Sequence, residues 1–231
     1  IAASGSGERL EDLIFLQVDD ELKFINDIKG MNPAIVYRPA DMKAAAKAIV
    51  ESAFAFSGQR LYSCSKVIVT ADDQKRLMEA ISEIMKDLHV GDPVDDVTFT
   101  GPIISDKAAK RFKDLTLENM PFTISKAPSA LDAISDLYVS PIVVSGLDDE
   151  NDLSYMDSGL PILNIKVVDS LDSAFEEIQD TECGLSAGLF AKDPKVIARF
   201  KEEVDVPLRY INESSRGLAA ANGAKLSAFC N

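Results

Sequence analysis

Residues 54–69 read FAFSGQRLYSCSKVIV and connect a helical pattern to a strand-like one. Before this stretch, Asp41 is suited to cap a helix, and apolar residues then recur at helical spacing at Met42, Ala46, Ile49, Val50 and Ala53. Its last residues begin a short apolar run, residues 66–70 (KVIVT), that is typical of a strand. The order predicts a helix, a polar connection and a buried strand.

Strand-like and helical segments alternate along the rest of the chain. We expect further strands at residues 34–37, 141–144, 160–168, 185–190 and 208–211. We expect further helices at residues 72–88, 105–112, 170–179 and 193–204, the last capped by Asp193 with Pro194 in its first turn. Near-continuous apolar strands between helices predict an α/β fold with a mostly parallel sheet and helices on both faces.

The composition excludes several classes of function. Lys and Arg number 24 against 38 Asp and Glu, a net charge of -14, which argues against nucleic acid or an anionic membrane as partner. We see no apolar run long enough to span a bilayer and no signal peptide, so we expect a cytoplasmic protein. The three cysteines (Cys64, Cys183, Cys230) and the single His89 lack metal-ligand spacing, so we expect no metal site.

Gly58-Gln59-Arg60-Leu61 resembles the Gly-Gln-x-Cys nucleophile segment of the aldehyde dehydrogenase family, with leucine at the cysteine position. Seven further segments resemble family motifs in chain order: residues 3–6 (ASGS), 32–36 (NPAIV), 90–93 (VGDP), 101–105 (GPIIS), 181–190 (TECGLSAGLF), 210–212 (YIN) and 223–227 (GAKLS). The resemblance implies that residues 27–231 form the catalytic-like α/β domain. Residues 1–26 are similar to the end of the dinucleotide-binding half.

Within the family, the chain is most similar to the 1-pyrroline-5-carboxylate (glutamate semialdehyde) dehydrogenases. Their nucleophile segment commonly reads Gly-Gln-Lys-Cys-Ser-Ala-Cys-Ser-Arg, so Leu61 takes the place of the first cysteine and Cys64 matches the second. The resemblance implies NAD(P)-dependent oxidation of an aldehyde or semialdehyde to its acid. A leucine cannot add to a carbonyl, so we expect this activity to be impaired or absent.

The resemblance also assigns the other site positions. It implies that Asp27 stands at the general-base position, although a solvated loop or helix-end acid is an equal interpretation of this residue. The carboxylate-binding positions of the semialdehyde enzymes correspond to Tyr62, Gly217 and Leu218, and the nicotinamide-facing positions to Gly5, Ser6 and Asp157.

The implied cofactor is NAD or NADP. The chain has no GxGxxG or other phosphate-binding glycine turn, so an intact dinucleotide site would need residues from outside it. The chain begins with Ile1 rather than methionine, and we expect a preceding segment.

Three interpretations follow. The first is an aldehyde dehydrogenase-like protein that lacks the catalytic thiol and has a role in binding, regulation or assembly. The second is an active oxidoreductase that uses Cys64, although three residues shift a side chain by about 10 Å along an extended chain. The third is an interaction module that pairs with a separate Rossmann-bearing subunit. Family members are usually oligomers, so a homo-oligomer is also expected.

Overall fold

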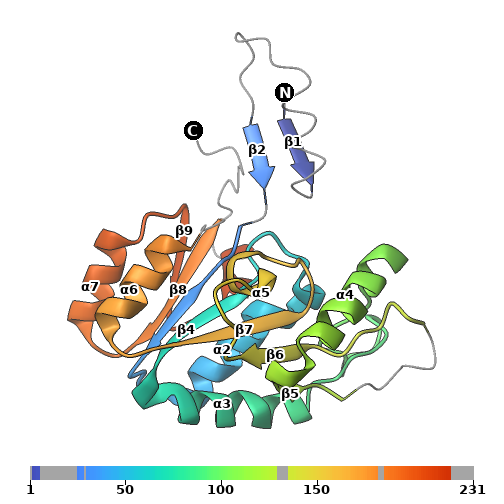
Figure 1. Cartoon of the computed structure of the whole chain (residues 1–231), viewed down its shortest axis with the longest axis horizontal. Helices are drawn as coiled ribbons and strands as arrows, with labels where there is room; N and C mark the ends of the chain where they lie inside the picture. Colours follow the sequence, from blue (N-terminus) through green and yellow to red (C-terminus); the bar gives the residue numbers. More distant parts are fainter. Residues whose placement is uncertain (1, 6–24, 29, 129–134, 182–184, 220–231) are drawn as a thin grey trace.

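The computed structural model describes residues 2–5, 25–28, 30–128, 135–181 and 185–219. Its main sheet has seven strands in the order β5-β6-β7-β4-β3-β8-β9 (Figure 1). The strands are β3 (Ala34–Tyr37), β4 (Lys66–Thr70), β5 (Thr123–Lys126), β6 (Ile142–Ser145), β7 (Ile162–Val168), β8 (Ser186–Ala191) and β9 (Leu208–Ile211). All neighbours run parallel except β5 and β6, which confirms the mostly parallel sheet.

Helices cover both faces of this sheet, as predicted. They are α2 (Met42–Phe54), α3 (Ala71–Lys86), α4 (Asp106–Glu118), α5 (Asp152–Tyr155), α6 (Leu171–Asp180) and α7 (Pro194–Glu203), with 3-10 turns η1 (Ala55–Gly58), η2 (Met120–Phe122) and η3 (Ser215–Ala219). Asp41 caps α2 by accepting from the amides of Lys43 and Ala44, and Asp193 caps α7 by accepting from the amide of Lys195. Each cap contributes about 1 kcal/mol.

The central strands divide their side chains between two cores. In β3, Ala34 and Val36 pack with α2 and α3, whereas Ile35 packs with α6 and α7 on the other face. In β4, Val67 packs in the first of these cores and Ile68 in the second, since neighbouring side chains of a strand point to opposite faces. Both faces are covered, so these strands are apolar throughout and could be recognised from sequence.

Among the strands and α-helices of the described residues from 30 onward, β5 and α5 were not expected from the sequence. β5 is an antiparallel edge strand whose residues alternate between half-buried and exposed, and its sequence TISK carries no continuous apolar run. α5 is a single turn of four residues, too short for a helical period to show. The helix predicted at residues 105–112 continues to Glu118.

A second sheet consists of β1 (Ala2–Gly5) and β2 (Ile25–Ile28), which pair in parallel with Ser4 opposite Asp27. Figure 1 shows this pair outside the seven-stranded sheet. The proposed division after residue 26 lies within β2 and stays a prediction.

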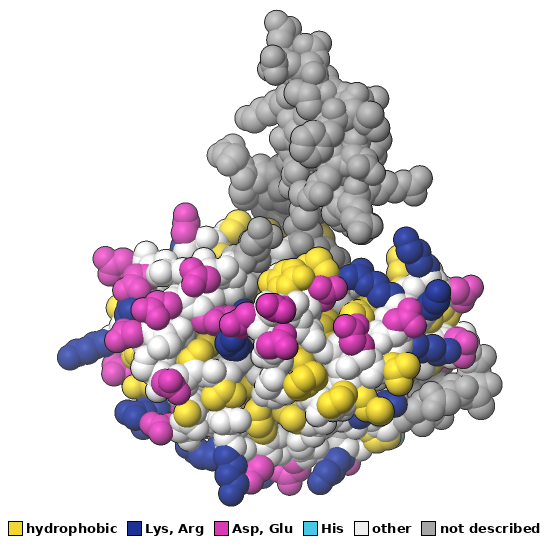
Figure 2. Space-filling model, in the orientation of Figure 1, with side chains coloured by type: hydrophobic (Ala, Val, Ile, Leu, Met, Phe, Trp, Pro, Cys, Tyr) yellow, Lys and Arg dark blue, Asp and Glu magenta, His cyan; other side chains and the backbone are white. Residues whose placement is uncertain are grey.

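The described residues contain no candidate membrane span and no candidate metal site. None of the helices in the described ranges has the length and apolar character needed to cross a membrane. In the same ranges, no cluster of three or more His, Cys, Asp and Glu side chains could hold a metal ion. On the face shown in Figure 2, acidic and basic side chains are interspersed rather than segregated.

Candidate active site around Leu61

The backbone between α2 and β4 takes an unusual path after α2 ends. Phe56, Ser57 and Gly58 all have positive φ angles, of 59°, 56° and 69°. For the two non-glycine residues this conformation costs about 1–2 kcal/mol each. The Ser57 hydroxyl offsets part of this cost, because it donates to the Gly101 carbonyl at 2.7 Å and shares a hydrogen bond with the Thr100 hydroxyl at 2.8 Å.

Gly58 allows the loop to contact a second segment of the site. A Cβ atom at Gly58 would lie 2.6 Å from the carbonyl oxygen of Leu160, closer than packing permits. The absence of a side chain therefore brings residues 157–161 against the loop. This is the segment to which the sequence assigned a cofactor-binding position at Asp157.

Gln59 fixes the loop to the segment before α4. Its side-chain amide nitrogen donates to the carbonyls of Phe56 at 3.0 Å and Pro102 at 3.3 Å. Its side-chain oxygen accepts from the Ile104 amide at 2.7 Å. The glycine and glutamine of the motif thus both serve to position the residues that follow them.

Leu61 and Tyr62 lie at the tip of a tight turn. The Ser63 amide donates to the Arg60 carbonyl at 3.1 Å, and the Arg60 amide donates to the Ser63 hydroxyl at 3.1 Å. Both tip residues are half-buried. A side chain at position 61 is therefore held at a partly accessible point, which suits a residue that meets a ligand.

Asn32 holds this turn from the beginning of the sheet. Its side-chain nitrogen donates to the carbonyls of Leu61 at 2.8 Å and Ser63 at 3.2 Å, and its side-chain oxygen accepts from the amides of Leu185 at 3.1 Å and Ser186 at 2.9 Å. The residue is fully buried. Asn32 therefore joins the turn to the residues that enter β8.

Cys64 lies behind the turn, inside the core. It is 1% exposed, and its thiol donates to the Lys66 carbonyl at 3.3 Å. Burial raises the pKa of the Cys64 thiol to about 12, although hydrogen bonding with the Tyr210 side chain and with the Lys66 backbone acts in the opposite direction. The thiol is protonated near neutral pH and out of contact with solvent, whereas a nucleophilic cysteine reacts as an accessible thiolate.

Ser52 of α2 connects Cys64 with the last described segment. Its carbonyl accepts from the Cys64 amide at 3.1 Å, and its hydroxyl accepts from the Ser215 amide at 2.9 Å. This link places η3, with Arg216 and Gly217, on the same side of α2 as the turn. The two parts are separated by about 150 residues of sequence.

Arg60 gives the site a positive charge. Its guanidinium lies 5.0 Å from the centre of the Phe56 ring and 5.7 Å from that of Tyr62, in cation-π contact with both. Partial burial lowers the pKa of Arg60; Tyr62 opposes this shift, and the nearby positive charge of Arg216 adds to it. Within the described part of the chain, neither arginine forms an ion pair.

A model of the aldehyde dehydrogenase family matches residues 14–230. The chain belongs to the aldehyde dehydrogenase family. It is 27% identical over 201 residues to 1-pyrroline-5-carboxylate dehydrogenase of Geobacillus sp. (strain WCH70). The matched region covers 84% of this chain and 38% of the relative. It is 29% identical over 205 residues to alpha-ketoglutaric semialdehyde dehydrogenase of Bacillus subtilis (strain 168), covering 85% of this chain and 41% of the relative.

A solved aldehyde dehydrogenase structure shows the same fold. The NAD-dependent benzaldehyde dehydrogenase from Corynebacterium glutamicum superposes with a TM-score of 0.80 at 26% identity, over 95% of this chain and 47% of that one. The chain thus spans less than half the length of these family members. The match confirms the family resemblance and the α/β fold.

The described contacts connect some of the predicted site positions and leave others open. Leu61, Tyr62, Cys64, Asp157 and Gly217 all lie on the loop or on segments that contact it. For Gly5 and Asp27 only the strand positions are described, Ser6 lies outside the described residues, and so does the side chain of Leu218. Their roles stay predictions.

Four residues of the site were not singled out by the sequence: Asn32 as an anchor, Ser52, Arg60 and Arg216. Asn32 stands in the NPAIV motif, so a signal for it was present. Ser52 is the single serine of α2, and no local sequence pattern marks its contacts.

Proposed function

We propose that this chain forms the catalytic-half scaffold of an aldehyde dehydrogenase-like protein that binds a carboxylate-bearing aldehyde or semialdehyde without attacking it covalently. One observation carries this proposal: Leu61 occupies the tip of the turn at the position where the family motif has its cysteine. In the family's chemistry a thiolate adds to the aldehyde carbon, and water later releases the acid. A leucine side chain has neither a lone pair to donate nor a proton to exchange.

The neighbouring thiol does not supply the missing nucleophile. Cys64 is enclosed by the core and bonded to the Lys66 carbonyl, and its pKa of about 12 leaves only a trace of thiolate at neutral pH. Covalent catalysis also demands placement of the reacting atom to within about 1 Å. This argument favours the first interpretation of the sequence over an oxidoreductase that uses Cys64.

Two arginines beside the turn favour a carboxylate on the ligand. Arg60 and Arg216 lie close enough for the charge of one to lower the pKa of the other. In a chain with a net charge of -14, such a pair without described carboxylate partners is unusual. An anion between them would relieve their repulsion, and a guanidinium binds a carboxylate with two parallel hydrogen bonds. In the sequence, Tyr62 stands two residues after Arg60, and Gly217 directly follows Arg216.

NAD or NADP is the proposed cofactor, which would accept the hydride in family chemistry. Asp157 is the described residue proposed to hold it, and its carboxylate is oriented by accepting from the Gly159 amide at 2.9 Å. Because the sequence has no phosphate-binding glycine turn, these residues fit the nicotinamide end of a dinucleotide site only. The phosphates require residues from another segment or a partner.

Calorimetric titration with glutarate, a stable dicarboxylate, tests the binding part of this proposal. We expect Arg60→Gln to raise the dissociation constant by about tenfold or more, since a hydrogen bond to a charged group contributes about 1.5–3 kcal/mol. Arg111→Gln, an exposed arginine of α4, is the matched control and should leave it unchanged. Absence of glutarate binding, or equal effects of the two variants, would refute the arginine site.

A further inference from the structure

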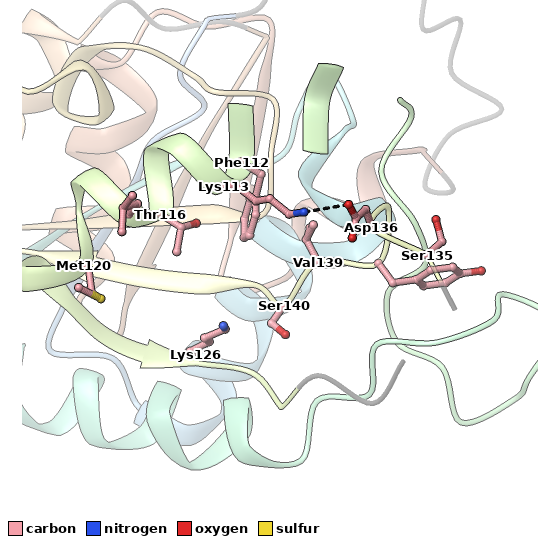
Figure 3. A pocket seen from close by; sticks show the side chains of 11 residues that line it. Phe112, Lys113, Thr116, Met120, Lys126, Ser135, Asp136, Val139 and Ser140 are labelled. Carbon is pink, nitrogen blue, oxygen red and sulfur yellow. Dashed lines mark hydrogen bonds and ion pairs between the residues drawn. The ribbon is translucent and has the colours of Figure 1, made fainter. Parts of the chain in front are cut away.

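A cavity of about 450 Å³ lies at the far end of the sheet, between α4 and the segment that enters β6 (Figure 3). Phe112 and Val139 form apolar walls, and Ser140 lies between Val139 and β6; all three are buried. The volume falls in the range of about 300–1,000 Å³ that small-molecule sites occupy. None of its lining residues belongs to the turn around Leu61, so this cavity is a separate feature.

The cavity carries one uncompensated positive charge. Lys113 and Asp136 line it as an ion pair, 2.9 Å from Nζ to Oδ2, and so neutralise each other (Figure 3). Lys126, at the end of β5, also lines the cavity and has no ion pair with any described side chain. The described lining residues therefore have a net charge of +1 in a strongly acidic chain.

The cavity also contains an unmet hydrogen-bonding group. Thr116 lines it from α4, and its buried hydroxyl has no hydrogen-bond partner among the described residues. A buried polar atom without a partner costs about 1–3 kcal/mol. Because this hydroxyl is shielded from solvent, a ligand in the cavity reaches it only after the Thr116 side chain changes rotamer.

We propose that this cavity binds a small amphipathic monoanion, with its carboxylate at Lys126 and an apolar or aromatic body against Phe112 and Val139. The single surplus positive charge, on the exposed Lys126, matches one negative charge on the ligand. The apolar walls select the body. The Lys113–Asp136 pair leaves no second cation for a dianion. The proposal does not depend on the chemistry at Leu61.

The test uses 4-phenylbutyrate as the probe and uncharged 4-phenylbutanol as its matched analogue, both titrated by calorimetry into the full chain. We expect 4-phenylbutyrate to bind about fivefold more tightly than the alcohol, the upper range for an ion pair with an exposed lysine. Lys126→Met should remove this preference, whereas Lys107→Met, an exposed lysine of α4 outside the cavity, should keep it. Lys126 is exposed, so its replacement leaves folding intact.

A second variant tests whether the 4-phenyl compounds bind in this cavity. Thr116→Phe fills the space from α4 and should abolish binding of both 4-phenyl compounds. Circular dichroism of the Thr116→Phe variant serves as the control for its folding. Failure of 4-phenylbutyrate to bind, equal binding of the acid and the alcohol, or full binding by the folded Thr116→Phe variant would overturn the proposal.

Discussion

The side-chain amide of Asn32 donates to the main-chain carbonyl of Leu61 at 2.8 Å. A residue that precedes β3 thus fixes the position where the family motif has its nucleophile. The support for that position is present in this chain, although the side chain it supports is a leucine. On the assignment that we propose for Leu61, the fold and the loop support the position, which carries no thiol.

Asn32→Asp should unfold at markedly lower denaturant concentration than the parent chain. The substitution removes the donor that serves the carbonyls of Leu61 and Ser63 and buries a carboxylate against them. Each of the two lost partners costs about 1–3 kcal/mol, so we expect a loss of about 2–6 kcal/mol in the free energy of unfolding. Gln74→Glu makes the same chemical change at a half-buried position of α3, where the amide donates only to the weak acceptor Sδ of Met78 at 3.8 Å, and should cost far less. A loss below about 1 kcal/mol for Asn32→Asp would contradict the anchoring role.

Gly58→Ala and Gly146→Ala form a matched pair at positive φ angles of 69° and 81°. In both variants the new alanine must adopt the left-handed conformation, which costs about 1–2 kcal/mol. Only at Gly58 does the added methyl meet a neighbour, the Leu160 carbonyl at 2.6 Å; at Gly146 nothing lies within 4 Å. We expect Gly58→Ala to lose a further 1–3 kcal/mol or so in urea unfolding. Equal losses in the two variants would show that the loop does not pack against Leu160.

The buried Cys64 thiol should make the protein less stable at alkaline pH. In the unfolded chain the thiol ionises with its ordinary pKa of 9.0, whereas folded Cys64 keeps its proton up to about pH 12. Between these values the unfolded state binds fewer protons than the folded state, so the free energy of unfolding falls as the pH rises. The loss from this group reaches about 2 kcal/mol near pH 10.5 or so.

The measurement is the difference in unfolding free energy between the parent chain and Cys64→Ala, followed from neutral to alkaline pH. The difference should shrink by that amount, because the alanine variant lacks the titrating group. Val69→Ala, a buried substitution in the same core cluster without a titrating side chain, should show a constant difference. A constant difference for Cys64→Ala as well would mean that the thiol ionises freely and is accessible.

Local patterns predicted most of the fold. The strands β3, β4 and β8 are buried on both faces, so their apolar runs were visible, and Asp41 and Asp193 marked the starts of two helices. The edge strand β5 was missed because one face of it is exposed, Ile124 included, and its composition is mixed. An edge strand of this kind depends on its partner β6 more than on its own sequence.

The site could be predicted only in part. The motif located Gly58, Gln59 and Leu61, because residues adjacent in sequence carry it. The effect of the Arg216 charge on Arg60 and the hydrogen bond from the Ser215 amide to the Ser52 hydroxyl depend on how the last described segment packs against α2. Ser52 and Ser215 are 163 positions apart, and no spacing rule connects such residues before the fold is known.

NAD(P)H formation by the complete natural gene product, with glutamate semialdehyde and a panel of simple aldehydes, tests most directly whether Leu61 removes the covalent reaction. Leu61→Cys and Cys64→Ser variants are assayed beside it. We predict no turnover by the natural protein or by Cys64→Ser, and a gain in Leu61→Cys, where a thiol returns to the tip of the turn. Turnover by the natural protein that disappears in Cys64→Ser would contradict this account and make Cys64 the nucleophile.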